Sequence, residues 1–253
     1  MTAIIGILCK NGIVIGSDSS ATFTAGTYRT IEQPMEKIEV IDGHLIMAST
    51  GSVGLSQRFS HLLRKAWQEK LSSSGSEENK SEFEIVKSIS RAFIEDMGHT
   101  FLKPGDFGAL LAFPFNNRCF LCEFGLRDFQ PEFKTERLWY CSMGSAQTIL
   151  DPFLGFLRDV FWVEGPPNIY EGIFAATWAL QHAIDVNPGG VNGPVSIAVL
   201  ERDNKGGLFA RKLSRDELGE HLQAIDEAKL HLRNVREKYK PEAGADLPQL
   251  DKR

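Results

Sequence analysis

The feature that most constrains the fold of this chain is the short spacing between its apolar segments. Residues 3–8 and 13–16 are apolar and flank Lys10-Asn11-Gly12, and an Asn-Gly pair in such a position is a strong β-hairpin signal. Further pairs of apolar segments flank residues 42–43, 116–117 and 202–207. Strands joined by turns this short run antiparallel, because a parallel connection needs a dozen or more residues.

Helical patterns come in pairs between these hairpins. Apolar residues recur at helical spacing within residues 55–67 and again within 82–96. A third helix is expected to begin at Gly144-Ser145, a fourth to span 170–184, and a long fifth to follow Ser214, whose hydroxyl would cap it. This order lacks the regular alternation of strand and helix that builds a parallel sheet. We therefore expect an α+β fold in which two antiparallel sheets pack together with helices outside them.

The composition is typical of a globular protein with a substantial core, since 42% of the 253 residues are hydrophobic and 24% are charged. We expect one domain over residues 1–213, a C-terminal helix over 214–240 that packs on it or extends from it, and a flexible tail over 241–253. The net charge of -5 argues against binding to nucleic acid or to an anionic membrane. Because the chain shows neither a signal-peptide pattern nor an apolar run long enough to span a membrane, a cytoplasmic location is expected.

Cys119 and Cys122 form a C-x-x-C within an expected strand. Residues three apart on a strand point to opposite faces of the sheet, so ordinary buried thiols are favoured over a redox or metal pair. The six histidines are scattered and none shows a metal-ligand spacing. No metal or organic cofactor is expected.

Thr2 is a candidate nucleophile if Met1 is removed. It would then carry a hydroxyl and a free α-amine, whose reference pKa of about 7.7–8.0 lies near cellular pH. Such an amine can act as the general base for its own hydroxyl. Many chains begin Met-Thr, so this feature taken alone favours the ordinary interpretation.

Three later residues strengthen the hypothesis. If the first hairpin turns at Asn11-Gly12, Asp18 returns close to the chain start, and Lys37 opens the next hairpin. A buried ammonium paired with Asp18 would stabilise an alkoxide on Thr2, although a turn aspartate and a solvated lysine remain open alternatives. Gly51 lies between a strand and a helix, where backbone N–H groups can bind an oxyanion. A phosphate loop is disfavoured at 50–54, because no lysine follows the last glycine.

These residues resemble the proteasome β subunits and their bacterial relative HslV, and most of all the stand-alone bacterial proteasome homologues. The resemblance covers residues 2–213, is strongest before Ser60, and implies a four-layer αββα sandwich, the N-terminal nucleophile (Ntn) hydrolase fold. The matching segments are Thr2 at the start of a strand, residues 16–22 (GSDSSAT), Lys37-Ile38, residues 49–51 (STG) before a helix, residues 143–146 (MGSA), and Asp185 followed by Gly189-Gly190.

The resemblance implies a role for each matched residue. Thr2 would be nucleophile and base, Asp18 and Lys37 the charged pair beneath it, and the Gly51 amide the oxyanion hole. Ser145 and Asp185 would hydrogen-bond near the Thr2 amine, although a helix cap and a surface acid at a helix end remain open for these two.

The same resemblance assigns the substrate contacts. Thr22 would offer backbone contacts to a bound peptide strand. An apolar specificity pocket would be lined by Met35, Ser49 and Val53.

The chain departs from the family pattern at several positions. Ser20 stands where many β subunits have arginine, and Pro188 where a serine normally lies, with Asn187 as a substitute. The segment between Thr22 and Lys37 is about three residues longer than in the family by this comparison, and the part after Leu213 is longer than in HslV.

The resemblance implies a threonine endopeptidase that assembles with itself into stacked homo-oligomeric rings, cleaves peptide substrates inside them, and has an ATP-dependent unfoldase as a possible partner. Two other functions remain open. One is an inactive proteasome-like ring scaffold, which the presence of Thr2, Asp18 and Lys37 disfavours. The other is an Ntn amidohydrolase that acts on small amides.

Overall fold

The structure is a computed structural model that describes residues 1–25, 28–72, 81–98, 105–187 and 189–239. The polar composition of residues 72–81 predicts a surface loop, and most of that segment, like the whole expected tail at 241–253, lies outside the described residues. No helix within the described part of the chain is long and apolar enough to cross a membrane.

The first sheet contains the N-terminal hairpin at its centre. Its strand order is β10-β1-β2-β11-β12, and every neighbouring pair is antiparallel. The hairpin predicted around Asn11-Gly12 is confirmed, since Cys9 pairs with Gly12 and Ile4 with Ser17. The strands are β1 (Ile4–Cys9), β2 (Gly12–Ser17), β10 (Tyr140–Met143), β11 (Ser196–Arg202) and β12 (Leu208–Lys212).

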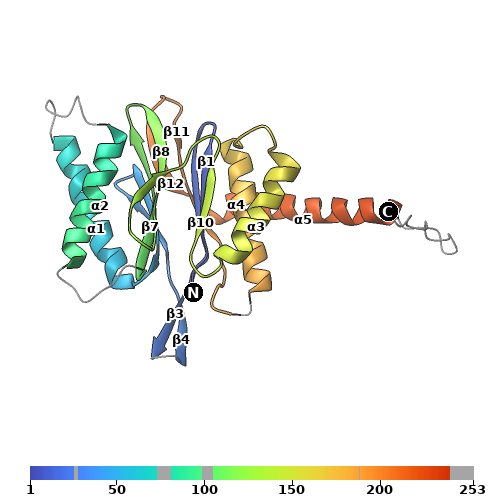
Figure 1. The fold of residues 1–253 in the computed structure, drawn as a ribbon. Helices are drawn as coiled ribbons and strands as arrows, with labels where there is room; N and C mark the ends of the chain where they lie inside the picture. Colours follow the sequence, from blue (N-terminus) through green and yellow to red (C-terminus); the bar gives the residue numbers. More distant parts are fainter. Residues whose placement is uncertain (26–27, 73–80, 99–104, 188, 240–253) are drawn as a thin grey trace, which may run out of the picture.

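The second sheet is a meander in the order β5-β6-β7-β8-β9, again antiparallel throughout. A separate two-stranded hairpin, β3 (Ser20–Ala25) with β4 (Tyr28–Pro34), projects from the body of the molecule (Figure 1). The strands of the meander are β5 (Ile38–Ile41), β6 (Leu45–Gly51), β7 (Phe107–Phe115), β8 (Arg118–Phe124) and β9 (Pro131–Phe133).

Helices cover the outer faces of both sheets, so the chain forms a four-layer αββα sandwich (Figure 1). The predicted α+β class is confirmed. Helices α1 (Val53–Ser72) and α2 (Glu82–Gly98) cover the second sheet, and α3 (Gln147–Phe161) and α4 (Ile169–Val186) cover the first. Helix α5 (Arg215–Lys238) crosses α4 and continues beyond it, and Ser214 caps it as predicted, with Glu217 completing a capping box.

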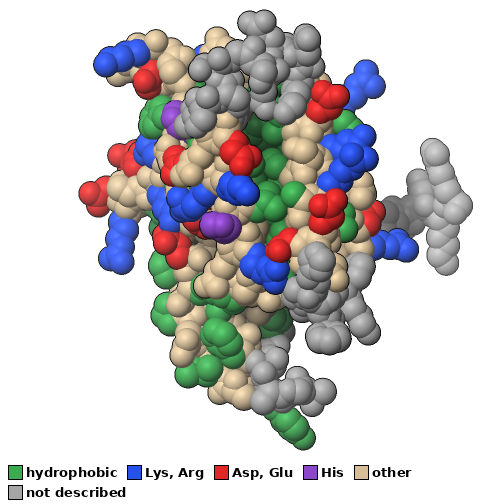
Figure 2. All heavy atoms as spheres, turned by 90° about the vertical axis from the view of Figure 1, so that its left-hand side faces the viewer, with side chains coloured by type: hydrophobic (Ala, Val, Ile, Leu, Met, Phe, Trp, Pro, Cys, Tyr) green, Lys and Arg blue, Asp and Glu red, His purple; other side chains and the backbone are tan. Residues whose placement is uncertain are grey.

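Two differences from the sequence prediction concern the strands. The sequence pattern at 137–141 predicts a further strand, but the strand β10 lies at Tyr140–Met143, and the residues before it form a tight bridge between Thr135 and Leu138. The hairpin formed by β3 and β4 was not predicted, because the apolar residues of β4, Tyr28 and Ile31, lie three apart and do not alternate with period two. The hairpin exposes the apolar side chains of Phe23, Tyr28 and Ile31. Apolar side chains gather at the lower end of the view in Figure 2.

The interior consists of three apolar layers. Isoleucines of both sheets, among them Ile4, Ile13 and Ile46, fill the space between the sheets. The layer under α3 and α4 contains the side chains of Ile5, Ile7 and their neighbours. The layer under α1 and α2 is rich in aromatic rings that meet edge to face or stacked. The outer face of α1 and α2 carries charged side chains of both signs (Figure 2).

The two thiols of the C-x-x-C motif diverge, as predicted from their spacing on a strand. Cys122 packs under α1 and α2, whereas Cys119 packs against the layer between the sheets. Both are free thiols, and burial raises the pKa of Cys119 to about 11. Neither thiol is therefore a ready nucleophile at neutral pH.

Replacing Phe59 by alanine tests the aromatic layer. The Phe59 ring is fully buried and contacts four other rings, so Phe59→Ala should lower the free energy of unfolding by about 3–5 kcal/mol. Phe83, which is half-exposed on α2, is the matched control and should cost much less when replaced by alanine. Urea unfolding at one protein concentration measures both, and equal losses would contradict the packing described.

Candidate active site

The centre of the candidate site is a buried ion pair between Asp18 and Lys37. Asp18 follows β2, and its N–H donates to the Ala3 carbonyl at 3.1 Å, which brings it back to the chain start as the hairpin predicts. Lys37 Nζ lies 2.6 Å from Asp18 Oδ1, and both side chains are buried. The alternative of a solvated lysine is therefore wrong.

The remaining acceptor capacity of Asp18 is used by backbone groups. Oδ1 also accepts from the Ala3 N–H at 2.8 Å, and Oδ2 accepts from the Ser20 N–H at 3.2 Å. The carboxylate is thus fixed in position by two backbone N–H groups, and it holds Lys37 in turn.

Lys37 is held at the first peptide bond of the chain. Its Nζ donates to the Met1 carbonyl at 3.0 Å. Burial lowers the pKa of Lys37, while attraction to Asp18 and, more weakly, to Glu32 opposes that shift. The positive charge is therefore placed directly beside the bond that joins Met1 to Thr2.

Thr2 is fixed by the turn that follows β10. Its N–H donates to Ser145 Oγ at 3.0 Å, and its carbonyl accepts from the Ala146 N–H at 3.2 Å. Gly144 makes this approach possible, because a Cβ there would lie 2.3 Å from the Thr2 carbonyl oxygen and its φ is +94°. The structure thus brings Ser145 to Thr2, and Ser145 is not the cap of α3, which begins after Ala146 without a side-chain cap.

Gly51 lies at the same end of the sheets as Lys37. Ile38 pairs with Ala48 across β5 and β6, so the last residues of β6 extend beside and beyond Lys37. Gly51 has a φ of +101°, and a Cβ there would lie 2.0 Å from the Asp106 carbonyl oxygen. Helix α1 begins two residues later, so Gly51 stands at the strand-to-helix turn that the sequence predicts.

The residues expected to contact substrate lie around this region but on different elements. Ser49 is half-buried on β6, where its hydroxyl donates to Ser56 Oγ at 2.7 Å, and Val53 is exposed at the start of α1. Met35 borders a groove of about 650 Å³ between β4, α4 and α5, to which neither Ser49 nor Val53 contributes. A single pocket made by all three stays a prediction. Thr22 lies on β3, near the chain start.

Asp185 lies in the last turn of α4 and is exposed. Its carboxylate accepts a hydrogen bond from Gln181 Nε2 at 2.7 Å, and its expected role near the Thr2 amine stays a prediction. The neighbouring Asn187 accepts from the Gly189 N–H at 3.0 Å, and Pro188 lies outside the described residues. Pairing between Gln181 and Asp185 is ordinary for helix positions four apart.

Sequence reasoning missed a polar cluster next to the ion pair. Glu32 on β4 accepts hydrogen bonds from Ser20 Oγ and from Asn192 Nδ2, and its charge favours the protonated form of Lys37. Ser20 stands where the family pattern has arginine, so a hydroxyl bonded to Glu32 occupies that position here. Glu32 could not be found in the sequence, because its hairpin was not predicted.

The chain was compared with protein families, curated sequences and solved structures. Residues 2–117 match the family described as proteasome subunit. One similar solved structure is "Anbu (ancestral beta-subunit) from Yersinia bercovieri", which matches with a TM-score of 0.67 and 14% identity over 97% of this chain and 100% of that chain. No curated protein sequence matches significantly. The resemblance to proteasome β-type subunits and the αββα Ntn fold are therefore confirmed.

Two glycine substitutions test the backbone at the strand-to-helix turn. Gly51→Ala should lower the free energy of unfolding by about 1–3 kcal/mol, because alanine tolerates neither its positive φ nor the close Asp106 carbonyl. Gly54→Ala is the matched control three residues later, where the nearest neighbouring atom is 3.9 Å from the added Cβ. It should be neutral or stabilising by up to about 1 kcal/mol, since alanine favours helix. Urea unfolding of both variants decides, and a Gly51→Ala protein as stable as the wild type would refute this account of the turn.

Proposed function

Because residues 2–117 match the family described as proteasome subunit, we propose that the chain is a threonine-type endopeptidase whose nucleophile is Thr2 after removal of Met1. The observation that carries the proposal is the buried Asp18–Lys37 pair, whose ammonium lies at the peptide bond before Thr2. Buried ion pairs are weak evidence for stability, because desolvation offsets their attraction. The position of the Asp18–Lys37 pair beside Thr2 is better explained by a role in the reaction at Thr2 than by a contribution to stability.

The structure supports a role for Met1 as a block on the uncleaved chain. The Met1 carbonyl accepts a hydrogen bond from Lys37 Nζ. The Met1 side chain lies against Gly190, beside Thr22 Oγ1. While Met1 is attached, the Thr2 nitrogen is an amide and cannot accept a proton. Its removal creates the amine and leaves Lys37 Nζ free to stabilise the Thr2 oxygen.

The proposed reaction is acyl transfer to Thr2. The Thr2 amine takes the hydroxyl proton as Oγ attacks the peptide carbonyl carbon, and the oxyanion that forms is bound by the Gly51 N–H. The tetrahedral intermediate collapses, the C–N bond breaks, and the ammonium returns its proton to the departing amine. Water then attacks the ester with the same amine as base, and a carboxylic acid and free Thr2 are released. Ser145, already bonded to the Thr2 nitrogen at 3.0 Å, would orient the amine.

The remaining parts of the proposal concern the protein's setting. We expect a cytoplasmic protein that assembles with copies of itself into stacked rings around the sites and cleaves peptides there without a cofactor. An ATP-dependent unfoldase is a possible partner for folded substrates. The family match supports self-assembly in general, and the chain's net negative charge makes nucleic acid an unfavourable partner.

Replacing Thr2 tests the nucleophile. Thr2→Ala should reduce cleavage of fluorogenic peptides with apolar residues before the scissile bond by at least about 10³-fold, because no hydroxyl remains to form the ester. Thr2→Ser is the matched control, since it keeps a hydroxyl and a small second residue, and it should keep measurable activity. Unchanged cleavage by Thr2→Ala would refute the assignment. If the wild-type protein hydrolyses small amides but no peptide, the amidohydrolase function is favoured. If it hydrolyses neither, the inactive scaffold is favoured.

The pH dependence tests the base and the ammonium together. The rate constant kcat/KM should rise as the Thr2 amine loses its proton, with an apparent pKa at or below about 8, because the nearby Lys37 charge disfavours a second cation. It should fall again as Lys37 loses its proton. Burial lowers the pKa of Lys37 from 10.5, so this fall should come at a lower pH than for an exposed lysine. A rate that does not change between about pH 5 and 10 would contradict both roles.

A further inference from the structure

Helix α5 carries one apolar stripe along its whole length. Seven residues recur at alternating intervals of three and four, which places them on one face of the helix. All are apolar or aromatic in character except one histidine. They are Leu218, His221, Ile225, Ala228, Leu232, Val235 and Tyr239.

The first half of this stripe is covered by the chain itself. His221 and Ile225 are buried, Leu218 and Ala228 pack against the same apolar layer, and the His221 ring lies 4.5 Å from the ring of Tyr170 on α4. These contacts fix the helix on the body of the protein. The first half of α5 therefore packs on the layer that contains α4.

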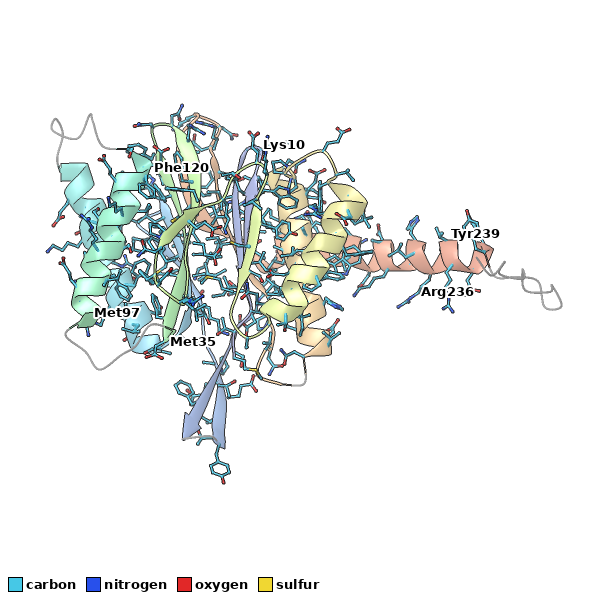
Figure 3. The ribbon with its side chains drawn as sticks, in the orientation of Figure 1. Lys10, Met35, Met97, Phe120, Arg236 and Tyr239 are labelled. Carbon is cyan, nitrogen blue, oxygen red and sulfur yellow. The ribbon has the colours of Figure 1, made fainter. Side chains whose placement is uncertain are left out.

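The second half of the stripe extends beyond the domain. Leu232 and Val235 are 55% and 50% exposed, and Tyr239 is 82% exposed. Figure 3 shows Arg236 and Tyr239 far from the sheets, at the end of α5. Residues 229–238, called the overhang below, form about 15 Å of helix. The overhang therefore presents an apolar face that the described part of the chain leaves exposed.

We propose that the overhang docks on the layer formed by α3 and α4 of a second copy of this chain. In Figure 1, α5 leaves the α3–α4 layer and projects outward past it, so a copy packed on that layer would lie beside the overhang. The outer face of α3 carries about half-exposed apolar side chains, namely Phe156, Val160 and Phe161. In a two-fold arrangement each copy would both provide an overhang and receive one.

The distribution of charge favours docking of the overhang on the α3–α4 layer of a second copy over docking of two overhangs on each other. Residues 229–238 carry four basic side chains and one acidic one, so two overhangs laid against each other would place like charges together. Residues 147–187, which contain α3 and α4, carry five acidic side chains and one basic one. That single arginine, Arg158, is paired with Asp159 at 2.9 Å. The basic overhang and the acidic layer are complementary.

This inference rests on the self-assembly part of the proposed function and adds the surfaces that would make it. It does not depend on the chemistry at Thr2. A helix that reaches across to a second copy would tie the stability of the assembly to residues far from the active site.

The test is a pair of leucine substitutions on the overhang. Leu232→Glu places a charge on the stripe, whereas Leu230→Glu makes the same change at a leucine that is 54% exposed but lies about 200° around the helix. Both cost the helix the same in intrinsic propensity, and far-UV circular dichroism checks that both fold. Sedimentation velocity over a range of concentrations gives the association state. Leu232→Glu should weaken assembly at least about tenfold, and Leu230→Glu should match the wild type.

A third variant tests the receiving surface. Val160→Glu on α3 should weaken assembly to a similar degree as Leu232→Glu. Normal assembly by either of these two variants would overturn the docking proposal and leave the proposed function standing. A wild type that stays monomeric at every concentration would overturn both this inference and the proposed rings.

Discussion

The arrangement of the site depends on the buried attraction between Lys37 and Asp18. Asp18 follows the last residue of β2 in the first sheet, and Lys37 precedes β5 in the second, so the pair joins the two sheets at one end of their interface. Removing two charges from water is costly, and a pair of well-packed apolar residues would stabilise the same place as well. The ion pair is instead suited to holding one positive charge in a fixed position beside Thr2.

Other segments reach the same place because of the sheet registers and two glycines. The pairing of β1 with β10 brings the turn at 144–146 to Thr2, and the pairing of β5 with β6 brings Gly51 past Lys37. At Gly144 and at Gly51 a side chain would collide with a carbonyl oxygen. The close approach of backbone segments is therefore encoded in residues that lack a Cβ, whereas charge and hydrogen bonding are supplied by Asp18 and Ser145.

Local signals in the sequence were enough to predict the features that local physics controls. The Asn-Gly turn sets the register that returns Asp18 to the chain start, and helical periodicity and the Ser214 cap place the helices. The β3–β4 hairpin could not be predicted, since its polar strands project from the body and bury no apolar face. Glu32 was missed with it, because its partners Ser20 and Asn192 are distant in sequence. The burial of Lys37 was likewise a matter of tertiary packing.

The central claim is that Thr2 acts only as the first residue of the mature chain, where its amine replaces the amide that Met1 imposes. The most direct measurement is the intact mass of the purified protein, with N-terminal sequencing, on the same sample whose peptidase activity is assayed. The account predicts a mass lower by one methionine residue, a sequence that begins Thr2-Ala3-Ile4, and activity proportional to that fraction. Full activity in a sample that retains Met1 would contradict it.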